Sequence, residues 1–177
     1  MKQLLLETER LWLRPFALGD EEQVLVFSSN PVINKYTGDP IITTLDGVTD
    51  LIKNVWLSDY KKFGYGRYAV IEKESKTILG FCGVKYLPEI DETDLGYRLI
   101  PNYWGKGIAT EASKAILEHA FNDLNLKRIV ATVYPENTAS TRVLKKLNFQ
   151  FEKKASYPDE EAILDWYVIT KEDYERS

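Results

Sequence analysis

The segment Tyr103-Trp104-Gly105-Lys106-Gly107-Ile108-Ala109-Thr110-Glu111-Ala112 joins an extended stretch that ends near Pro101 to a helix with a regular apolar stripe. Gly105 and Gly107 permit positive φ and let a ligand approach the backbone closely. The first N–H groups of the helix lack partners within it, and the positive end of the helix dipole attracts anions. Lys106 adds a mobile positive charge. The segment predicts a phosphate-binding turn, although two glycines before a helix also serve as a plain tight connection.

Two common nucleotide-binding motifs do not match this segment. A Walker A loop needs a lysine directly after its last glycine, and Ile108 follows Gly107 instead. A dinucleotide fingerprint needs glycine or alanine at the position of Thr110, and an acidic residue about twenty residues further on, where Leu126-Lys127 stands. The turn therefore belongs to a different structural setting.

The chain of 177 residues has the size and composition of one compact domain, so we predict a single domain over residues 1–177. Apolar residues make up 44% and charged residues 28%, with no linker-like run and no internal repeat. The apolar run near the N-terminus is too short for a signal peptide or membrane span, which favours a cytoplasmic protein. The lone cysteine, Cys82, agrees with that compartment and is expected to be buried.

A net charge of −4 and an isoelectric point near 5.2 argue against direct nucleic-acid binding, which rests on Lys and Arg contacts to phosphate. Membrane association is not expected either, and a cationic partner is favoured. The sequence shows no cluster with metal-ligand spacing, so no metal is expected. His119, the only histidine, falls in the middle of a predicted helix and is expected to be structural.

Residue periodicity predicts a mixed α/β order with strands at the centre and at the end of the chain. Apolar residues repeat at three- and four-residue spacing in the helices and alternate in the strands. Gly64, Asn125 and Asn148 stand where helices are expected to end. Strands are predicted over residues 10–16, 67–72, 77–87, 93–100, 129–134, 149–152 and 163–169, and helices over 20–29, 51–63, 108–124 and 138–147.

Three segments carry a resemblance when they are read in order. They are Asp94-Leu95-Gly96-Tyr97-Arg98-Leu99-Ile100-Pro101 with the turn and helix start after it, Asn137-Thr138-Ala139-Ser140-Thr141-Arg142-Val143-Leu144 with Leu147-Asn148-Phe149, and Thr8-Glu9-Arg10-Leu11-Trp12-Leu13-Arg14-Pro15-Phe16. Together they resemble the GNAT superfamily of acetyl-CoA-dependent N-acetyltransferases. The opening segment is similar to the RimJ/RimL-like branch, which includes ribosomal-protein N-terminal acetyltransferases.

The resemblance implies an α+β fold with a mixed, mostly antiparallel sheet of about six or seven strands and about four flanking helices. The sheet would splay between the strand ending near Ile100 and the strand near Tyr134. Acetyl-CoA, as cosubstrate, would lie in that splay, where the amide-rich pantetheine arm can satisfy backbone groups as an added strand would.

The resemblance also implies which residues bind the cofactor. The backbone of Leu99 and Ile100 would contact pantetheine. Asn137 would hold the same arm while also capping the next helix, and either role explains an asparagine there. Arg142 would reach a phosphate or merely cover the helix surface. The pyrophosphate would lie on the turn formed by Trp104, Gly105, Lys106, Gly107, Ile108, Ala109 and Thr110; Trp104 replaces the Gln or Arg that many members carry.

The implied chemistry is direct attack of a neutral amine on the thioester, which needs a base, an oxyanion donor and a proton for the leaving sulfur. The superfamily's tyrosine acid is missing, because Leu144 stands seven residues after Asn137. We expect Ser140 to replace it, although it could be an ordinary helix serine. Asp94 is the preferred base, acting through water, and Glu160 in a late charged loop is the second candidate.

The sequence leaves the acceptor open. It could be a protein N-terminus, possibly on a ribosomal protein, or a small-molecule amine, and the chain could be a monomer or a homodimer. A non-catalytic acyl-CoA-binding module is the alternative to an enzyme. Several aromatic residues could line an acceptor cleft or pack in the core: Tyr36, Trp56, Tyr60, Tyr65 and Tyr157.

Overall fold

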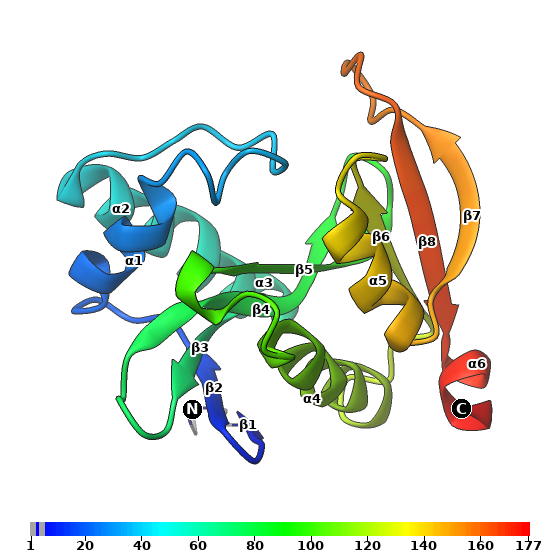
Figure 1. Cartoon of the computed structure of the whole chain (residues 1–177), viewed down its shortest axis with the longest axis horizontal. Helices are drawn as coiled ribbons and strands as arrows, with labels where there is room; N and C mark the ends of the chain where they lie inside the picture. The colour runs from blue at the N-terminus through cyan, green and yellow to red at the C-terminus, as the bar shows by residue number, and fades with distance from the viewer. Residues whose placement is uncertain (1–2, 4–5) are drawn as a thin grey trace.

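The computed structural model describes residue 3 and residues 6–177. Its centre is a sheet with the strand order β1-β2-β3-β4-β5-β6-β8-β7 (Figure 1). Neighbouring strands are antiparallel except β5 and β6, which are parallel. The strands are β1 (Leu6–Glu7), β2 (Leu11–Pro15), β3 (Arg67–Glu72), β4 (Ile78–Leu87), β5 (Glu92–Leu99), β6 (Arg128–Val133), β7 (Gln150–Ala155) and β8 (Leu164–Thr170).

Helices cover both faces of this sheet. One face carries α1 (Glu21–Ser28) and a longer helix in which α2 (Leu45–Leu51) runs through the π-helical turn Ile52–Trp56 into α3 (Leu57–Phe63). The opposite face carries α4 (Ile108–Asn122) and α5 (Thr138–Lys146). The short 3-10 turn Pro101–Tyr103 precedes α4, and α6 (Lys171–Arg176) ends the chain.

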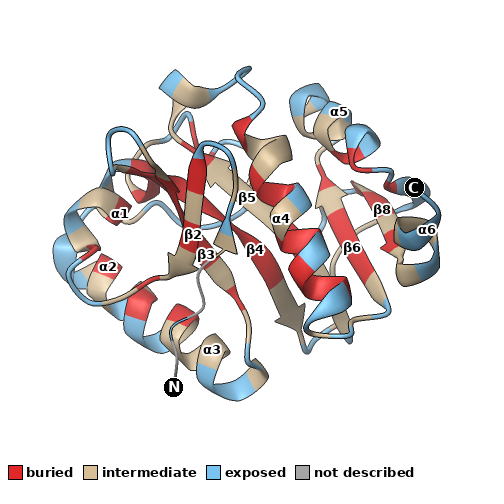
Figure 2. Ribbon diagram, turned by 90° about the horizontal axis from the view of Figure 1, so that it is seen from below, coloured by how far each residue is buried: buried red, intermediate tan, exposed pale blue. Residues whose placement is uncertain are grey.

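The alternation of side chains along the central strands builds a separate core on each face. On β3, Tyr68 and Val70 join the core under α4, whereas Ala69 and Ile71 join the core under α1 and α2. Figure 2 shows buried residues along the inner side of α4 and along the strands beneath it. β5 is thus fixed between two packed layers, so the side chains it presents to either face are held in place.

The fold class predicted from the sequence is confirmed, and most helix ends fall where the stop signals predicted them. Gly64, Asn125 and Asn148 all have positive φ, at 80°, 54° and 64°. The sheet has one strand more than the predicted six or seven, because β1 pairs with β2. Over the described residues the helices number five when the run through the π turn is counted once, because α6 adds to the predicted four.

The two additional helical segments have local causes that apolar periodicity does not register. α2 begins six residues before the predicted apolar stripe, because the Thr44 side chain caps it by accepting from the Gly47 N–H. α6 begins with a capping box in which Thr170 and Asp173 bond to each other's backbone N–H. Within residues 6–177, no helix is long and apolar enough to cross a membrane.

β5 and β6 are joined by a single bridge, between Asp94 and Val130. Beyond that pair the two strands part, so the sheet opens between the C-terminal half of β5 and the end of β6. This opening, which we call the splay, lies where the sequence resemblance implied it. In chain order, α4 comes after β5 and α5 comes after β6, as Figure 1 shows.

Candidate active site

The backbone of β5 presents alternate residues to the splay. The Ile100 N–H donates to the Leu79 carbonyl on the neighbouring strand β4, at 2.8 Å. Since backbone groups alternate direction along a strand, those of Leu99 and Tyr97 point the other way, toward β6. Leu99 therefore offers its N–H to the splay. Ile100 does not, because its N–H is used within the sheet and its carbonyl accepts from the Tyr103 N–H at 3.1 Å.

The Trp104 side chain binds the end of β5 instead of pointing into the turn as a polar side chain for the cofactor would. Its indole N–H donates to the Leu99 carbonyl at 2.7 Å, while about half of its surface remains exposed. Sequence reasoning treated Trp104 as a departure from the superfamily pattern and missed this bond. The contact fixes the start of the turn relative to the last residue of β5.

The glycine turn has the backbone geometry that its sequence predicted. Gly105 and Gly107 have φ of 71° and 78°, and Gly107 precedes α4 with no side chain capping the first helical N–H groups. Residues 104–107 are exposed, Ala109 and Thr110 are half-buried, and Ile108 is buried in the core, so Ile108 can contribute only its backbone. A cavity of about 310 Å³ lies beside the turn, lined by Glu9, Gly107, Thr110, Glu111, Lys114 and Lys146.

The turn is held from behind by Arg10 and Glu111. The Glu111 carboxylate accepts from Thr8 Oγ1 at 2.6 Å and from the backbone N–H and Nε of Arg10 at 2.9 and 2.7 Å. Arg10 Nη1 then donates to the Lys106 carbonyl at 2.9 Å. Burial alone would raise the pKa of Glu111, but these hydrogen bonds outweigh it and lower the pKa. The connection between β1 and β2 thus fixes the turn from about one hundred residues away in the chain.

We expect Glu111→Ala to raise the Kd for acetyl-CoA about five- to tenfold, because a turn released from Arg10 loses roughly 1 kcal/mol of preorganisation. Calorimetric titration measures this effect. Glu118→Ala, an exposed glutamate further along α4, is the matched control and should leave the Kd unchanged. An unchanged Kd in Glu111→Ala would contradict the role of this contact.

The ionised carboxylate of Glu111 also stabilises the fold. This contribution is fully present at pH values above the ordinary pKa of a glutamate, and it is lost as the pH falls through the lowered pKa of Glu111.

Asn137 and Ser140 meet β5 at the other side of the splay. Asn137 Oδ1 accepts from the Ser140 N–H at 3.3 Å, so the predicted N-cap is present. Tyr97, which sequence reasoning did not single out, donates its hydroxyl to the Ser140 carbonyl at 3.3 Å. Burial raises the pKa of Tyr97 to about 12. Ser140 is half-buried, and Arg142 is exposed on the outside of α5.

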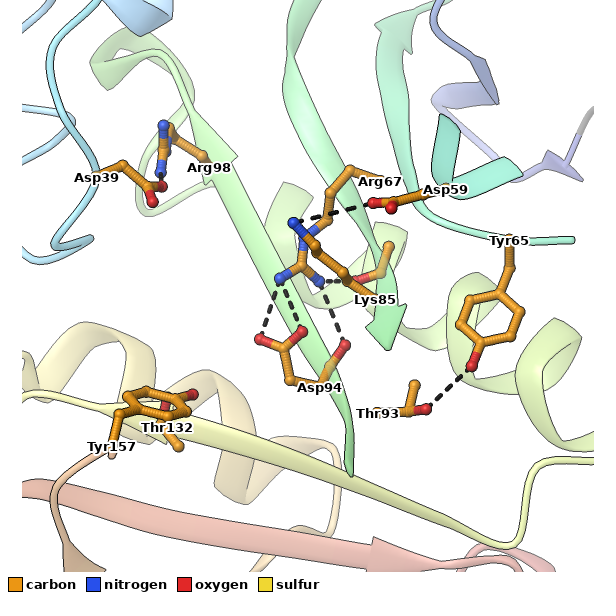
Figure 3. Close-up of polar contacts among 11 residues, drawn as sticks. Asp39, Asp59, Tyr65, Arg67, Lys85, Thr93, Asp94, Arg98, Thr132 and Tyr157 are labelled. Carbon is orange, nitrogen blue, oxygen red and sulfur yellow. Dashed lines mark hydrogen bonds and ion pairs between the residues drawn. The ribbon is translucent and has the colours of Figure 1, made fainter. Parts of the chain in front are cut away.

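Asp94 is paired with Arg67, whose side chain is largely enclosed. Arg67 Nη2 donates to both Asp94 carboxylate oxygens, at 2.9 and 3.0 Å, and Nη1 donates to the carbonyls of Gly83 and Asp94 (Figure 3). The two side chains are only 12% and 13% exposed. A Cβ at Gly96 would lie 2.5 Å from Arg67 Nη2, so this glycine leaves room for the guanidinium. An amine can reach the occupied carboxylate most readily through water.

Other polar groups surround this pair on the face of α1 to α3. Asp59 Oδ2 lies 3.9 Å from Lys85 Nζ, and burial raises the pKa of Asp59. The hydroxyls of Tyr157 and Thr132 are 2.8 Å apart, and Tyr157 feels the charges of both Asp94 and Arg67. Burial raises the pKa of Tyr157 to about 12. Figure 3 shows this tyrosine across from Asp94, on the side of β6.

Glu160 lies in the exposed loop between β7 and β8, at a cavity of about 560 Å³ that Tyr157 and Trp166 also line. It is therefore on the Tyr157 side of the site, while Asp94 is on β5. Tyr157 and Glu160 line the same cavity, and the charges of Glu160 and Asp94 both help to raise the pKa of Tyr157. The role of each carboxylate as a base stays a prediction.

The remaining residues singled out in the sequence divide between site and core. Trp56 stacks on Phe16 with ring centroids 3.9 Å apart, and the Tyr60 hydroxyl accepts from the Phe16 N–H, so both belong to the core. The Tyr65 hydroxyl is hydrogen-bonded to the Thr93 hydroxyl, and the ring centroids of Tyr36 and Tyr134 lie 6.0 Å apart.

Cys82 is buried as predicted, and its Sγ lies 3.5 Å from the Ser113 hydroxyl oxygen. His119 is also buried, with Nδ1 2.6 Å from Asp123. Over residues 6–177 no three His, Cys, Asp or Glu side chains gather at a metal-binding distance.

A sheet that parts between two parallel strands, with an uncapped glycine turn and helix after the first of them, is the arrangement that the sequence resemblance implied for an acetyl-CoA-dependent acyltransferase. A family model described as an acetyltransferase (GNAT) domain matches residues 10–150. The N-acetyltransferase p20 of Bacillus licheniformis is 37% identical over 149 residues, which are 83% of this chain and 83% of that protein. The chain belongs to the GNAT family of N-acetyltransferases, in its RimJ/RimL-like branch, and members of this family use acetyl-CoA.

Solved structures agree with this assignment. A GNAT-family acetyltransferase from Bacillus anthracis superimposes with a TM-score of 0.80 at 27% identity, over 96% of this chain and 99% of that one. The ribosomal-protein-S5-alanine acetyltransferase of Vibrio fischeri superimposes with a TM-score of 0.78 at 21% identity, over 97% and 98% of the two chains. At that identity the second comparison shows a shared fold alone.

Proposed function

We propose that this protein transfers the acetyl group of acetyl-CoA to a primary amine, by direct attack of the neutral amine on the thioester in a ternary complex. The observation that carries the proposal is the position of the Asp94–Val130 bridge. The splay opens toward the glycine turn on one side of this bridge, and the Arg67–Asp94 pair lies at the bridge itself. Cofactor and polar groups therefore meet where the two strands part.

On this proposal, the cofactor's pantetheine arm lies along β5. The Leu99 N–H faces the splay, and the Asn137 side-chain amide can donate from the opposite rim. The exposed N–H groups from Trp104 to Thr110, with Lys106, suit the pyrophosphate. Arg142 on α5 is a further candidate for a phosphate. The backbone of Ile100 contributes less than the sequence resemblance implied, because its N–H already bonds to Leu79.

The proton transfers are assigned to the polar groups around the bridge. Asp94 accepts the amine proton through a water molecule, since Arg67 already holds both carboxylate oxygens. Glu160 is the second candidate base, on the opposite rim beside Tyr157. Ser140 supplies the proton for the leaving sulfur, and Tyr97, whose hydroxyl lies against the Ser140 carbonyl, stands in the same part of the splay.

The first experiment measures the thermal midpoint with and without acetyl-CoA, with NADH and ATP as controls. At 100 times Kd, binding stabilises the fold by about 2.7 kcal/mol, which is roughly 5 to 11 °C for a domain of this size. A shift with acetyl-CoA alone supports the assigned cleft. No shift at millimolar acetyl-CoA would contradict it.

The second experiment measures coenzyme A release against a panel of amines, from peptide N-termini to small amines. Release that depends on an amine supports direct transfer in a ternary complex. Tight acetyl-CoA binding without release for any amine would favour the non-catalytic binding module. Sedimentation in the same buffers distinguishes a monomer from a homodimer.

A further inference from the structure

Arg98 is a second guanidinium on the face of β5 that carries Asp94. The two residues are four apart on one strand, so their side chains point to the same face. The Arg98 guanidinium lies 5.0 Å from the centroid of the Phe81 ring, and that of Arg67 lies 5.8 Å from the same ring. Figure 3 shows Arg98 on the same strand as Asp94. Arg98 is therefore on the face of β5 where an amine would meet Asp94.

The charge of Arg98 is much less well satisfied than that of Arg67. Its side chain is only 12% exposed, yet its one ion pair joins Nη2 to Asp39 at 2.6 Å. The Asp39 side chain is 63% exposed, and the buried Arg98 Nε has no hydrogen-bond partner among the described residues. Burial lowers the pKa of Arg98 despite the contact with Asp39. A largely buried cation whose one ion-pair partner is exposed would be better satisfied by an anion that accepts more than one of its hydrogen bonds.

Asp39 can leave this contact at little cost to the fold. It lies in the connection between α1 and α2, outside regular structure, and its carboxylate faces solvent. A planar guanidinium binds a carboxylate best through two parallel N–H donors, and Arg98 has donors besides Nη2 for such an arrangement. Asp39 thus occupies, with one oxygen, a position where a ligand carboxylate could bind with two.

The charges around the bridge point to the kind of acceptor. Asp94 pairs with Arg67 and Asp39 pairs with Arg98, whereas Asp59 lies 3.9 Å from Lys85 and its buried Oδ2 has no hydrogen-bond partner among the described residues. Positive and negative side chains thus alternate on this face, although the overall charge of the chain had favoured a cationic partner. An acceptor with one amine and one carboxylate matches these alternating charges.

We propose that Arg98 binds a carboxylate of the acceptor in exchange for Asp39, so that the protein selects amines that carry a nearby carboxylate. This inference rests on the proposed function. The strand rise puts the Cα atoms of Asp94 and Arg98 about 13 Å apart. An amino acid with a side-chain carboxylate, or a peptide N-terminus with an early acidic residue, can bridge them when a water molecule joins its amine to Asp94, as proposed above.

The test compares paired ligands in the presence of coenzyme A. One pair is glutamate and glutamine amide; the other is Ala-Asp-amide and Ala-Asn-amide. Calorimetric titration reports binding whether or not turnover occurs, and coenzyme A release gives kcat/KM. We expect Arg98→Met to weaken the carboxylate ligand at least tenfold, to change its uncharged counterpart less than twofold, and to leave the Kd for acetyl-CoA unchanged. Arg176→Met, on the exposed last helix, is the control for loss of a positive charge.

Asp39→Asn provides a change of opposite sign, which a merely structural role of Arg98 would not produce. Removing the competing internal anion should tighten the carboxylate ligand about threefold or more. Preference for glutamate identifies a small-molecule source, and preference for Ala-Asp-amide a peptide source. Equal binding of charged and uncharged ligands, or equal loss of both in Arg98→Met, would overturn the inference. Arg98-dependent binding without acetylation of any amine would support it and contradict the proposed catalytic function instead.

Discussion

Asp94→Ala is expected to lower kcat by about two orders of magnitude or more and the thermal midpoint by roughly 6 to 20 °C. The loss of activity follows from removing the proposed base, which contributes a factor of about 10² or more. The loss of stability follows because Arg67 keeps its buried charge without a partner, which costs about 3 to 5 kcal/mol. Coenzyme A release and thermal unfolding measure the two effects.

Asp20→Ala is the matched control for this variant. Asp20 forms a comparable pair with Arg14, at 2.8 Å with side chains 26% and 10% exposed, at the start of α1 and away from the splay. It should also lower the midpoint, but with kcat near that of the wild type at a temperature where the protein is folded. If Asp94→Ala retained wild-type kcat, or if Asp20→Ala lost as much, Asp94 would have no special part in the chemistry. A matching loss in Glu160→Ala alone would assign the base there.

Gly80→Ala is expected to disrupt the fold itself. Gly80 has φ of 149°, and an added Cβ would lie 1.8 Å from the Arg98 carbonyl oxygen, which is backbone and cannot rotate away. The residue stands where the pairing of β3 with β4 shifts register, opposite Val70. We expect a loss of more than about 4 kcal/mol, in the range that only a few mechanisms reach. The midpoint of urea unfolding measures it.

Gly105→Ala separates this steric clash from conformational strain. Gly105 also has a positive φ, but nothing lies within 4 Å of the position of its Cβ. The substitution should therefore cost only the strain of a left-handed residue, about 1 to 2 kcal/mol. Similar losses in both variants would contradict the steric explanation. Gly80 packs against the backbone of β5, which would bind the cofactor. Gly80→Ala should therefore also lose acetyl-CoA binding under conditions where some protein remains folded.

Much of the fold could be predicted because its signals are local. Apolar periodicity gave the long helix α4 within two residues of its end, and Gly105 and Gly107 marked the turn. The alternation of β5 contained a further constraint that was missed, because two successive residues such as Leu99 and Ile100 cannot both turn their N–H groups to one side. Strand geometry alone therefore required that only one of these two residues offer its N–H to the cofactor.

The charge partners of the site could not be predicted in the same way. Arg67 and Asp94 are 27 residues apart and Arg10 and Glu111 are 101 apart, and tertiary ion pairs leave no periodic trace in a sequence. One indirect signal was present. Gly96 interrupts the interior of a strand, and a glycine there often marks the close approach of another group, in this case the Arg67 guanidinium.

The parting of β5 from β6 beyond Asp94 affects how binding energy can be used. The groups facing the splay would interact with the pantetheine arm, and this arm is the same in acetyl-CoA and in coenzyme A. Contacts there stabilise the bound substrate, the transition state and the bound product alike, so they lower KM without raising kcat. Product inhibition by coenzyme A is therefore expected. Any preference for the loaded cofactor must arise within the few ångströms around the acetyl group, at the closed end where the two strands still touch.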